Sequence, residues 1–335
     1  MNKKLVLALL VLLLLSALLW WKMNTRNNET LNRSLSDFAV KDTSGVTGIV
    51  LTDKEKNRVE LRRTPGGWMV NGKFPSRKDA IHLLLETIYG LEVRSPVGRA
   101  GHNTVIRRLA TKSVKVEIFR NDALLKSYFV GGPTQDQQGT YMLMEDSDVP
   151  FIIGLSGFSG YLTPRYFTSE DLWKSPTLFP LRAQDIASVK LMSNENPEQS
   201  WELTNRNNLL SLSDPLNGKG LPLDTLGARA YLTRFLELKY EAVDHNKSLR
   251  DSLAKLPSRE EFTVTSREGK VFGLKTFYKK NPVDDSEIRA GAAPPYDPDR
   301  FWAVLNNDSG SVLLLQYFVM DPVMVPRSFF TVVKK

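Results

Sequence analysis

The residue types that most often carry out chemistry are few and scattered in this sequence. The three histidines, His82, His102 and His245, lie far apart, and none stands in a His-x-x-x-His spacing that would bind zinc. A packed or surface histidine is therefore the more frequent situation for each of them. The chain has no cysteine, which excludes disulfides, thiolate nucleophiles and thiolate metal sites. We predict no metal site and no cofactor.

Two glycine-rich segments resemble catalytic loops only in composition. Ser156 and Ser159 lie within the run Gly154–Gly160, but neither completes the Gly-x-Ser-x-Gly turn that exposes a nucleophile. The run Gly131–Pro133 lacks the Lys-Ser/Thr pair that follows a phosphate-binding loop. Both segments are more typical of sharp turns, where glycine's conformational freedom is useful. We predict no catalytic residue.

A group of aspartates could in principle bind calcium. Four aspartates fall in the segment Lys279 to Arg300, which is rich in Pro, Asp and Ala: Asp284, Asp285, Asp297 and Asp299. They lack the alternating spacing and the terminal Glu of the calcium-binding loop, so we expect a solvated loop. Carboxylate pairs that cleave glycosidic bonds cannot be recognised from spacing, because their separation is spatial. A hydrolase therefore stays among the alternatives.

The most distinctive stretch is the hydrophobic run from Leu5 to Trp21, which contains no charge and only one polar residue, Ser16. As a helix it would span roughly 26 Å, close to the roughly 30 Å of a bilayer's hydrocarbon core. We predict an uncleaved single-pass anchor over residues 1–26. The residues expected at the two membrane surfaces are Lys3, Lys4, Trp20, Trp21 and Lys22.

A cleaved signal peptide is the alternative to this anchor. Its apolar region is usually about 7–15 residues and ends in a small-x-small site. Here the run is longer and ends in two leucines and two tryptophans. The charges flanking the run are balanced, and the very short segment before it favours a cytoplasmic N-terminus. We therefore expect the bacterial inner membrane as location, with the body in the periplasm.

The rest of the chain has the composition of a folded protein. It is 41% hydrophobic and 10% aromatic overall, which is enough to build cores. Lys3, Lys4, Lys22 and Arg26 supply four of the net +8 charges, so the body stands near +4. We find no dense basic stripe with interleaved aromatics, and nucleic acid is not expected as a partner.

The body begins, after a polar tether at 27–45, with short strand patterns. An amphipathic helix is predicted over Arg77–Leu91, with Ser76 as its N-cap and Asp79 three residues later. A shorter helix is predicted over His102–Ala110. The expected strands are Val46–Leu51, Arg58–Leu61, Trp68–Val70, Val114–Phe119, Leu124–Val130, Thr140–Met144 and Phe151–Ile153.

The second half repeats this order of elements. A helix face is formed by Leu226, Ala230, Tyr231, Phe235 and Leu238, and a short helix by Ser248–Leu256. The expected strands are Ile186–Leu191, Ser200–Leu203, Glu261–Thr265, Val271–Phe277, Phe301–Leu305 and Val312–Gln316. We predict an α+β fold of two tandem similar repeats, 46–175 and 176–335, the second with an inserted loop at 279–300. Each has a mostly antiparallel sheet with one long and one short helix.

Each repeat ends in a segment with Pro-Arg followed closely by aromatic residues, a composition typical of protein interfaces. The alternative is that these segments pack one repeat onto the next, with Arg165 and Arg327 in structural salt bridges. The candidate interface residues are Tyr161, Pro164, Arg165, Tyr166, Phe167, Trp173, Pro326, Arg327 and Phe329.

Several segments together resemble a known family. They are Trp68–Gly72, the helix Arg77–Leu91, Gly139–Met142 and Gly160–Arg165, and they are similar to the bacterial family catalogued as domain of unknown function 4340. The resemblance implies a membrane-anchored envelope protein, associated with transporters of the ATP-binding-cassette (ABC) type, and gives no reaction or catalytic residue to transfer. We therefore expect a non-enzymatic subunit with a protein partner in a transport complex. The alternatives are a periplasmic module that binds glycan or peptide between its repeats, and a hydrolase.

Overall fold

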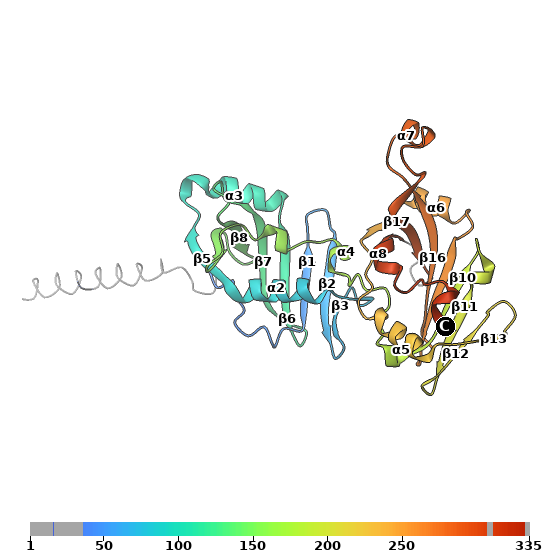
Figure 1. Cartoon of the computed structure of the whole chain (residues 1–335). Helices are drawn as coiled ribbons and strands as arrows, with labels where there is room; N and C mark the ends of the chain where they lie inside the picture. Colours follow the sequence, from blue (N-terminus) through green and yellow to red (C-terminus); the bar gives the residue numbers. More distant parts are fainter. Residues whose placement is uncertain (1–15, 17–35, 307–310, 332–335) are drawn as a thin grey trace, which may run out of the picture. The chain divides into compact units, whose positions relative to one another are not determined.

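The computed structural model describes residues 16, 36–306 and 311–331, and the chain divides into two compact units between Ser175 and Pro176 (Figure 1). We call them the first and the second unit. The anchor expected over residues 1–26, apart from Ser16, and residues 27–35 of the expected tether lie outside the described residues. Within the described residues, no helix is long and apolar enough to cross a membrane.

In the part of the first unit that the structure describes, nine strands form one antiparallel sheet (Figure 1). The strands are β1 (Gly48–Thr52), β2 (Arg58–Thr64), β3 (Gly67–Val70), β4 (Phe74–Pro75), β5 (Leu91–Pro96), β6 (Val114–Arg120), β7 (Ala123–Pro133), β8 (Thr140–Met144) and β9 (Phe151–Leu155). Their order across the sheet is β4-β3-β2-β1-β6-β7-β8-β9-β5.

The described residues of the second unit form a sheet with the same topology. Its strands are β10 (Ile186–Ser193), β11 (Trp201–Arg206), β12 (Leu209–Ser213), β13 (Gly220–Leu221), β14 (Ala242–Asp244), β15 (Glu260–Ser266), β16 (Val271–Lys280), β17 (Tyr296–Leu305) and β18 (Val312–Gln316). Their order is β13-β12-β11-β10-β15-β16-β17-β18-β14, which repeats the first sheet strand for strand. The predicted α+β fold of two similar antiparallel sheets is thus confirmed.

The helices also occupy matching places along the chain. In the first unit, α2 (Lys78–Gly90) precedes β5 and α3 (Arg99–Thr111) follows it; α5 (Thr225–Leu232) and α6 (Lys247–Leu253) do the same around β14. Instead of one long and one short helix, α2 and α3 have 13 residues each. The short elements are α4 (Glu170–Trp173), α7 (Asp285–Arg289), α8 (Tyr317–Met320) and the 3-10 turns η3 (Thr163–Arg165), η4 (Ala183–Asp185), η5 (Pro197–Gln199), η6 (Thr233–Phe235) and η7 (Arg327–Phe330).

One face of the first sheet is buried under α2. Apolar residues recur along α2 at spacings of three and four, so Ile81, Leu84 and Ile88 share one side of the helix and are buried. On the sheet, alternation places Val59 and Leu61 toward this core and their neighbours outward. Burying each such side chain contributes about 1.5–3 kcal/mol. The core therefore fixes the side of the sheet on which α2 lies.

The second core is more aromatic. Tyr231 and Phe235 lie in α5 and η6 and pack on Trp201 and Phe262 of the sheet, with Phe235 and Phe262 stacked at a centroid separation of 6.1 Å. Leu226, expected on this apolar face, is 81% exposed. Asp224 caps the helix by accepting from Leu226 N and Gly227 N, and this start places Leu226 on the outer side.

The start of the body also differs from expectation. Phe38, Ala39 and Val40, expected in the polar tether, are buried in the first core. The backbone of Val40 donates to Ile88 O at 3.2 Å, which fastens this segment to α2. Three consecutive apolar residues within a polar stretch are the signal in the sequence that explains the packing.

The start of α2 lies one residue later than predicted. Arg77 rather than Ser76 occupies the N-cap, and no side chain caps the helix. Ser76 is still paired with the sheet, because its backbone N–H and its Oγ both donate to Trp68 O at 2.9 Å. Pairing with the sheet thus continues through Ser76. Its hydroxyl, expected to cap the helix, instead bonds to the backbone of Trp68.

The segment 279–300, expected to be a loop, is largely ordered structure. β16 and β17 continue into it as an arm that ends in α7, visible at the top of the second unit in Figure 1. Lys279 Nζ lies 2.7 Å from Asp297 Oδ2, and Tyr278 stacks on Tyr296 at 4.4 Å between centroids. These two contacts accompany the pairing of β16 with β17, which continues to Lys280 and Tyr296, beyond the strand end expected at Phe277.

Gly131 on β7 offers a test of the packing between α3 and the sheet. A Cβ at Gly131 would lie 2.5 Å from Leu109 Cδ2 and 3.0 Å from Tyr141 O, whereas one at Gly132 would meet nothing within 4 Å. We expect Gly131→Ala to lower the free energy of unfolding by about 1–3 kcal/mol through overpacking. The matched control Gly132→Ala should stay within about 0.5 kcal/mol of the native protein. Equal urea midpoints for the two variants would show that the close contact does not exist.

Candidate functional site

Two of the nine candidate interface residues are buried in the first core. Tyr166 is 1% exposed and contacts Tyr128 edge-on at 6.4 Å between centroids. Trp173 is 0% exposed, lies 4.2 Å from the Phe167 ring, and donates from Nε1 to Phe167 O at 2.9 Å. These two side chains hold the end of the first unit together and are not available to a partner.

The two arginines of these segments contact groups of their own units. Arg165 lies 4.5 Å over the Phe158 ring and donates from Nη1 to Thr87 Oγ1 at 2.9 Å. Arg327 donates from Nη1 to Glu198 O at 2.9 Å and lies 3.4 Å from Asp214 Oδ2. Of the remaining candidates, Pro164 and Pro326 are exposed and Tyr161, Phe167 and Phe329 are half-buried. Their role at an interface stays a prediction.

A different group of side chains forms a partly exposed surface on the second unit. We call it the Arg259 patch; it consists of Arg259, Tyr278, Tyr296, Tyr317 and Phe318. The Arg259 guanidinium lies between two rings, 4.9 Å from the centroid of Tyr278 and 5.5 Å from that of Tyr317. Its Nη1 also donates to Tyr317 Oη at 2.9 Å. Tyr296, Tyr278, Arg259 and Tyr317 thus form a row in which each member is held by its neighbours.

The two ends of the Arg259 patch are open to solvent. Tyr296, stacked on Tyr278 at one end, is 46% exposed, and Phe318, next to Tyr317 in α8, is 88% exposed. Tyr, Trp and Arg are the residues most enriched among binding hot spots, because they bury a large area while losing little conformational freedom. An exposed aromatic row of this kind is therefore suited to contact another molecule.

Carboxylates surround the arginine of the patch. Glu195 Oε2 lies 3.7 Å from Arg259 Nε and accepts from Tyr278 Oη at 3.1 Å, and Glu260 Oε1 lies 3.9 Å from Arg259 Nη2. Burial raises the pKa of the Glu260 carboxyl, and the charge of Arg259 opposes this only in part. Burial likewise raises the pKa of Asp321. Three acidic side chains thus lie around one arginine.

None of the residues of the Arg259 patch is singled out by the sequence. Arg259 and Tyr317 are 58 positions apart, and their neighbours come from strands β16 and β17 and from helix α8. The sheet brings these elements together through long-range pairing, which no local pattern records. One signal in the sequence is the number of aromatic residues in β16, where Phe272, Phe277 and Tyr278 occur within one strand.

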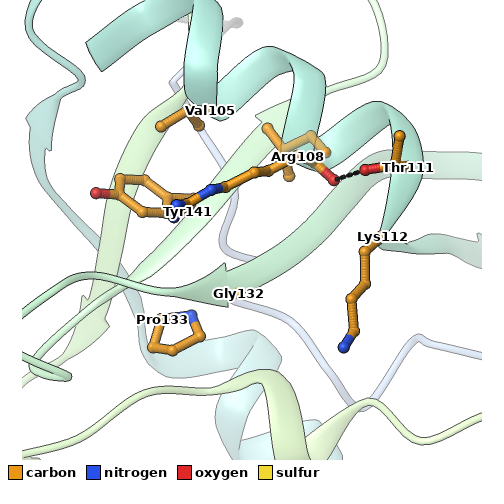
Figure 2. A pocket seen from close by; sticks show the side chains of 8 residues that line it. Val105, Arg108, Thr111, Lys112, Gly132, Pro133 and Tyr141 are labelled. Carbon is orange, nitrogen blue, oxygen red and sulfur yellow. Dashed lines mark hydrogen bonds between the residues drawn. The ribbon is translucent and has the colours of Figure 1, made fainter.

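A pocket of about 370 Å³ lies in the first unit beneath α3 (Figure 2). Its apolar walls come from α3 and from strands β7 and β8, and two cationic side chains from the end of α3 stand at its edge. The lining residues are Val105, Arg108, Leu109, Thr111, Lys112, Gly132, Pro133 and Tyr141. The volume falls within the range of about 300–1,000 Å³ that holds small molecules. The run Gly131–Pro133, expected to be a turn, instead lies at the end of strand β7, and its last two residues form part of the cavity wall.

Two of the four aspartates considered for calcium, Asp284 and Asp297, have other roles. Asp297 Oδ2 is held by Lys279, and its Oδ1 accepts from the backbones of Asp299 and Arg300 at 3.0 Å. Asp284 caps α7 by accepting from Ser286 N at 2.7 Å. These bonds explain the local fold of the arm without an ion.

Glu260 and its neighbour Glu261 provide a pH test of the Arg259 patch. A carboxyl whose pKa is raised by folding destabilises the protein above that pKa and ceases to do so as pH falls below its ordinary value near 4.3. Glu260→Gln should therefore raise the unfolding midpoint at pH 7, and the gain should vanish near pH 4. The matched control is Glu261→Gln, which should lower the unfolding midpoint at pH 7, because the hydrogen bond from Lys275 lowers the pKa of Glu261.

Glu261→Gln should accordingly lose roughly 0.2–1 kcal/mol at pH 7. Its stabilising contribution is present above the ordinary pKa and is lost as pH falls through the lowered one, so this difference also shrinks in acid. Thermal unfolding at pH 7 and pH 4 measures both variants. Shifts of the same sign at pH 7 would contradict the assigned burial of Glu260.

Comparison with known proteins identifies the family. The sequence profile of the family described as Domain of unknown function (DUF4340) matches residues 70–251, just over half of the chain. The match begins at the last residue of β3 and ends within α6, so it crosses from the first unit into the second. Searches of curated proteins and of solved structures found no significant match. The chain belongs to the DUF4340 family.

Proposed function

We propose that the protein is a non-enzymatic, membrane-anchored envelope protein that binds a protein partner through the Arg259 patch. The anchor would be the run Leu5–Trp21, with the N-terminus in the cytoplasm and both units in the periplasm of a bacterium. The observation that carries the proposal is the patch itself, a row of three tyrosines and one arginine, with the exposed Phe318 next to Tyr317 in α8.

Two features of the patch support a protein rather than a small molecule as its ligand. The open rings are separated by a half-buried, hydrogen-bonded arginine, so the surface is broad and holds its shape before binding. The carboxylates of Glu195, Glu260 and Asp321 lie around it and would attract a segment rich in Lys or Arg. An aromatic centre with a charged surround is the usual anatomy of a protein interface.

The proposed partner is a subunit of an ABC-type transport complex, for which this protein would be an accessory subunit. This part rests on the family resemblance and on the hydrophobic run, which would hold the two units close to other membrane proteins. The second candidate, a periplasmic ligand-binding module, is favoured by one specific observation, the pocket beneath α3. Glycan or peptide was the ligand expected from the sequence.

Purification of the full chain from membranes in mild detergent tests the proposed partner. We expect a permease or ATPase subunit of one ABC transporter to co-purify in fixed proportion. Phe318→Ser should reduce the recovered partner at least tenfold, since loss of a hot-spot ring costs about 2 kcal/mol or more. The matched control Leu209→Ser alters another exposed apolar side chain of the second unit and should leave the partner bound. Recovery of the native chain alone would contradict the proposal.

The proposed anchor is tested by the mature protein itself. We expect the intact N-terminal sequence on the mature chain, and retention in the membrane after an alkaline carbonate wash, because the run Leu5–Trp21 stays in the bilayer. Removal of residues 1–26 should release the body into the soluble periplasmic fraction when it is exported with another leader. A mature chain that begins after Trp21 would exclude the anchor.

A further inference from the structure

We infer that the pocket beneath α3 binds an amphiphilic anion, namely a carboxylate or phosphate attached to an apolar chain or ring. The inference is independent of the proposed partner, because the pocket lies in the first unit and the Arg259 patch in the second. It rests on two observations, the apolar wall and the pair of cations at the edge, and the second sheet, which carries Phe277 at the position of Gly131, serves as the comparison.

The wall of the pocket is apolar and closely fitted. Val105 and Leu109 are buried on the inner side of α3, and Pro133 and Tyr141 close the other side from the sheet. Figure 2 shows the Tyr141 ring beneath the helix, with Gly132 leaving the floor without a side chain. A cavity of about 370 Å³ would hold on the order of ten water molecules. Water against such a wall has few polar partners, so its replacement by an apolar group is favourable.

The edge of the pocket is positively charged. Arg108 and Lys112 both line it, and neither takes part in the ion pairs formed by the described residues of the first unit. They stand at the C-terminal end of α3, where the helix dipole favours cations. Two exposed cations hold a bare anion only weakly in water. Affinity therefore requires that the anion carry an apolar group into the pocket.

The second unit shows what the same place looks like when it is filled. Val130 pairs with Met142 in the first sheet and Thr276 with Ala303 in the second, at matching strands. The next residue on the central strand is Gly131 in one case and Phe277 in the other. Phe277 pairs with Trp302 across the sheet and packs against Leu253 of α6. The partly buried Trp302 packs against the same cluster. Under α6 an aromatic ring thus stands at the position of Gly131, beside which Leu109 packs under α3, and only Gly132 faces open space.

Calorimetric titration of the full chain in lipid nanodiscs tests the inference, with empty nanodiscs as the blank. The probes are octyl phosphate, octanoate, octanol and inorganic phosphate, which separate the anion from its apolar group and phosphate from carboxylate. We expect one saturable site per chain for at least one of the two amphiphilic anions. Octanol and inorganic phosphate should each bind at least tenfold more weakly than that anion.

Three variants locate the site. The double variant Arg108→Gln with Lys112→Gln should bind the amphiphilic anion at least tenfold more weakly and bind octanol with unchanged affinity. Gly132→Leu should abolish binding of all four probes, since a side chain there enters open space. The matched control Arg107→Gln removes a neighbouring cation of α3 that does not line the pocket and should bind normally.

The inference is overturned if neither amphiphilic anion binds saturably, if octanol binds as tightly as both anions, or if Gly132→Leu binds with native affinity. Thermal unfolding of each variant shows whether it is folded. Should Gly132→Leu fail to fold, the comparison of the double variant with Arg107→Gln decides the question by itself.

Discussion

The contact between one face of each antiparallel sheet and its covering helix is the constraint on which the rest of the structure depends. Ile81, Leu84 and Ile88 of α2 bury one face of the first sheet, and Tyr231 and Phe235 do the same for the second. With that face covered, every strand must alternate in one register, since a slip by one residue would turn its apolar side chains to water. The same strand order in both units follows from repetition of this single arrangement.

The other face of each sheet differs between the two units. Under α3, Gly131 allows Leu109 to approach the strand and Gly132 lines a cavity; under α6, Phe277 stands at the position of Gly131 and packs against Leu253. The second unit has an arm between β16 and β17, and the Tyr278–Tyr296 stack at its base supplies two of the five residues of the Arg259 patch. Two similar sheets thus carry two different surfaces.

The sequence predicts the fold far better than the surfaces that could bind a ligand. The strands at Thr140–Met144 and Val312–Gln316 agree with the structure to the residue, because alternation is a local signal. The sequence does not predict the order of strands across each sheet, since pairing partners such as β5 and β9 are distant in the chain. The Arg259 patch and the pocket arise from side chains of several strands and helices, so no spacing in the sequence records either of them.

The central claim is that the exposed end of the Arg259 patch contacts a protein partner in the cell. Site-specific photo-crosslinking in intact cells tests it directly, with the photoreactive residue in place of Phe318 and, as the comparison, in place of Leu209. The account predicts one discrete adduct with a membrane transport subunit from position 318 and none from position 209. Failure to form a specific adduct at position 318, in a chain that is stably produced and membrane-bound, would contradict it.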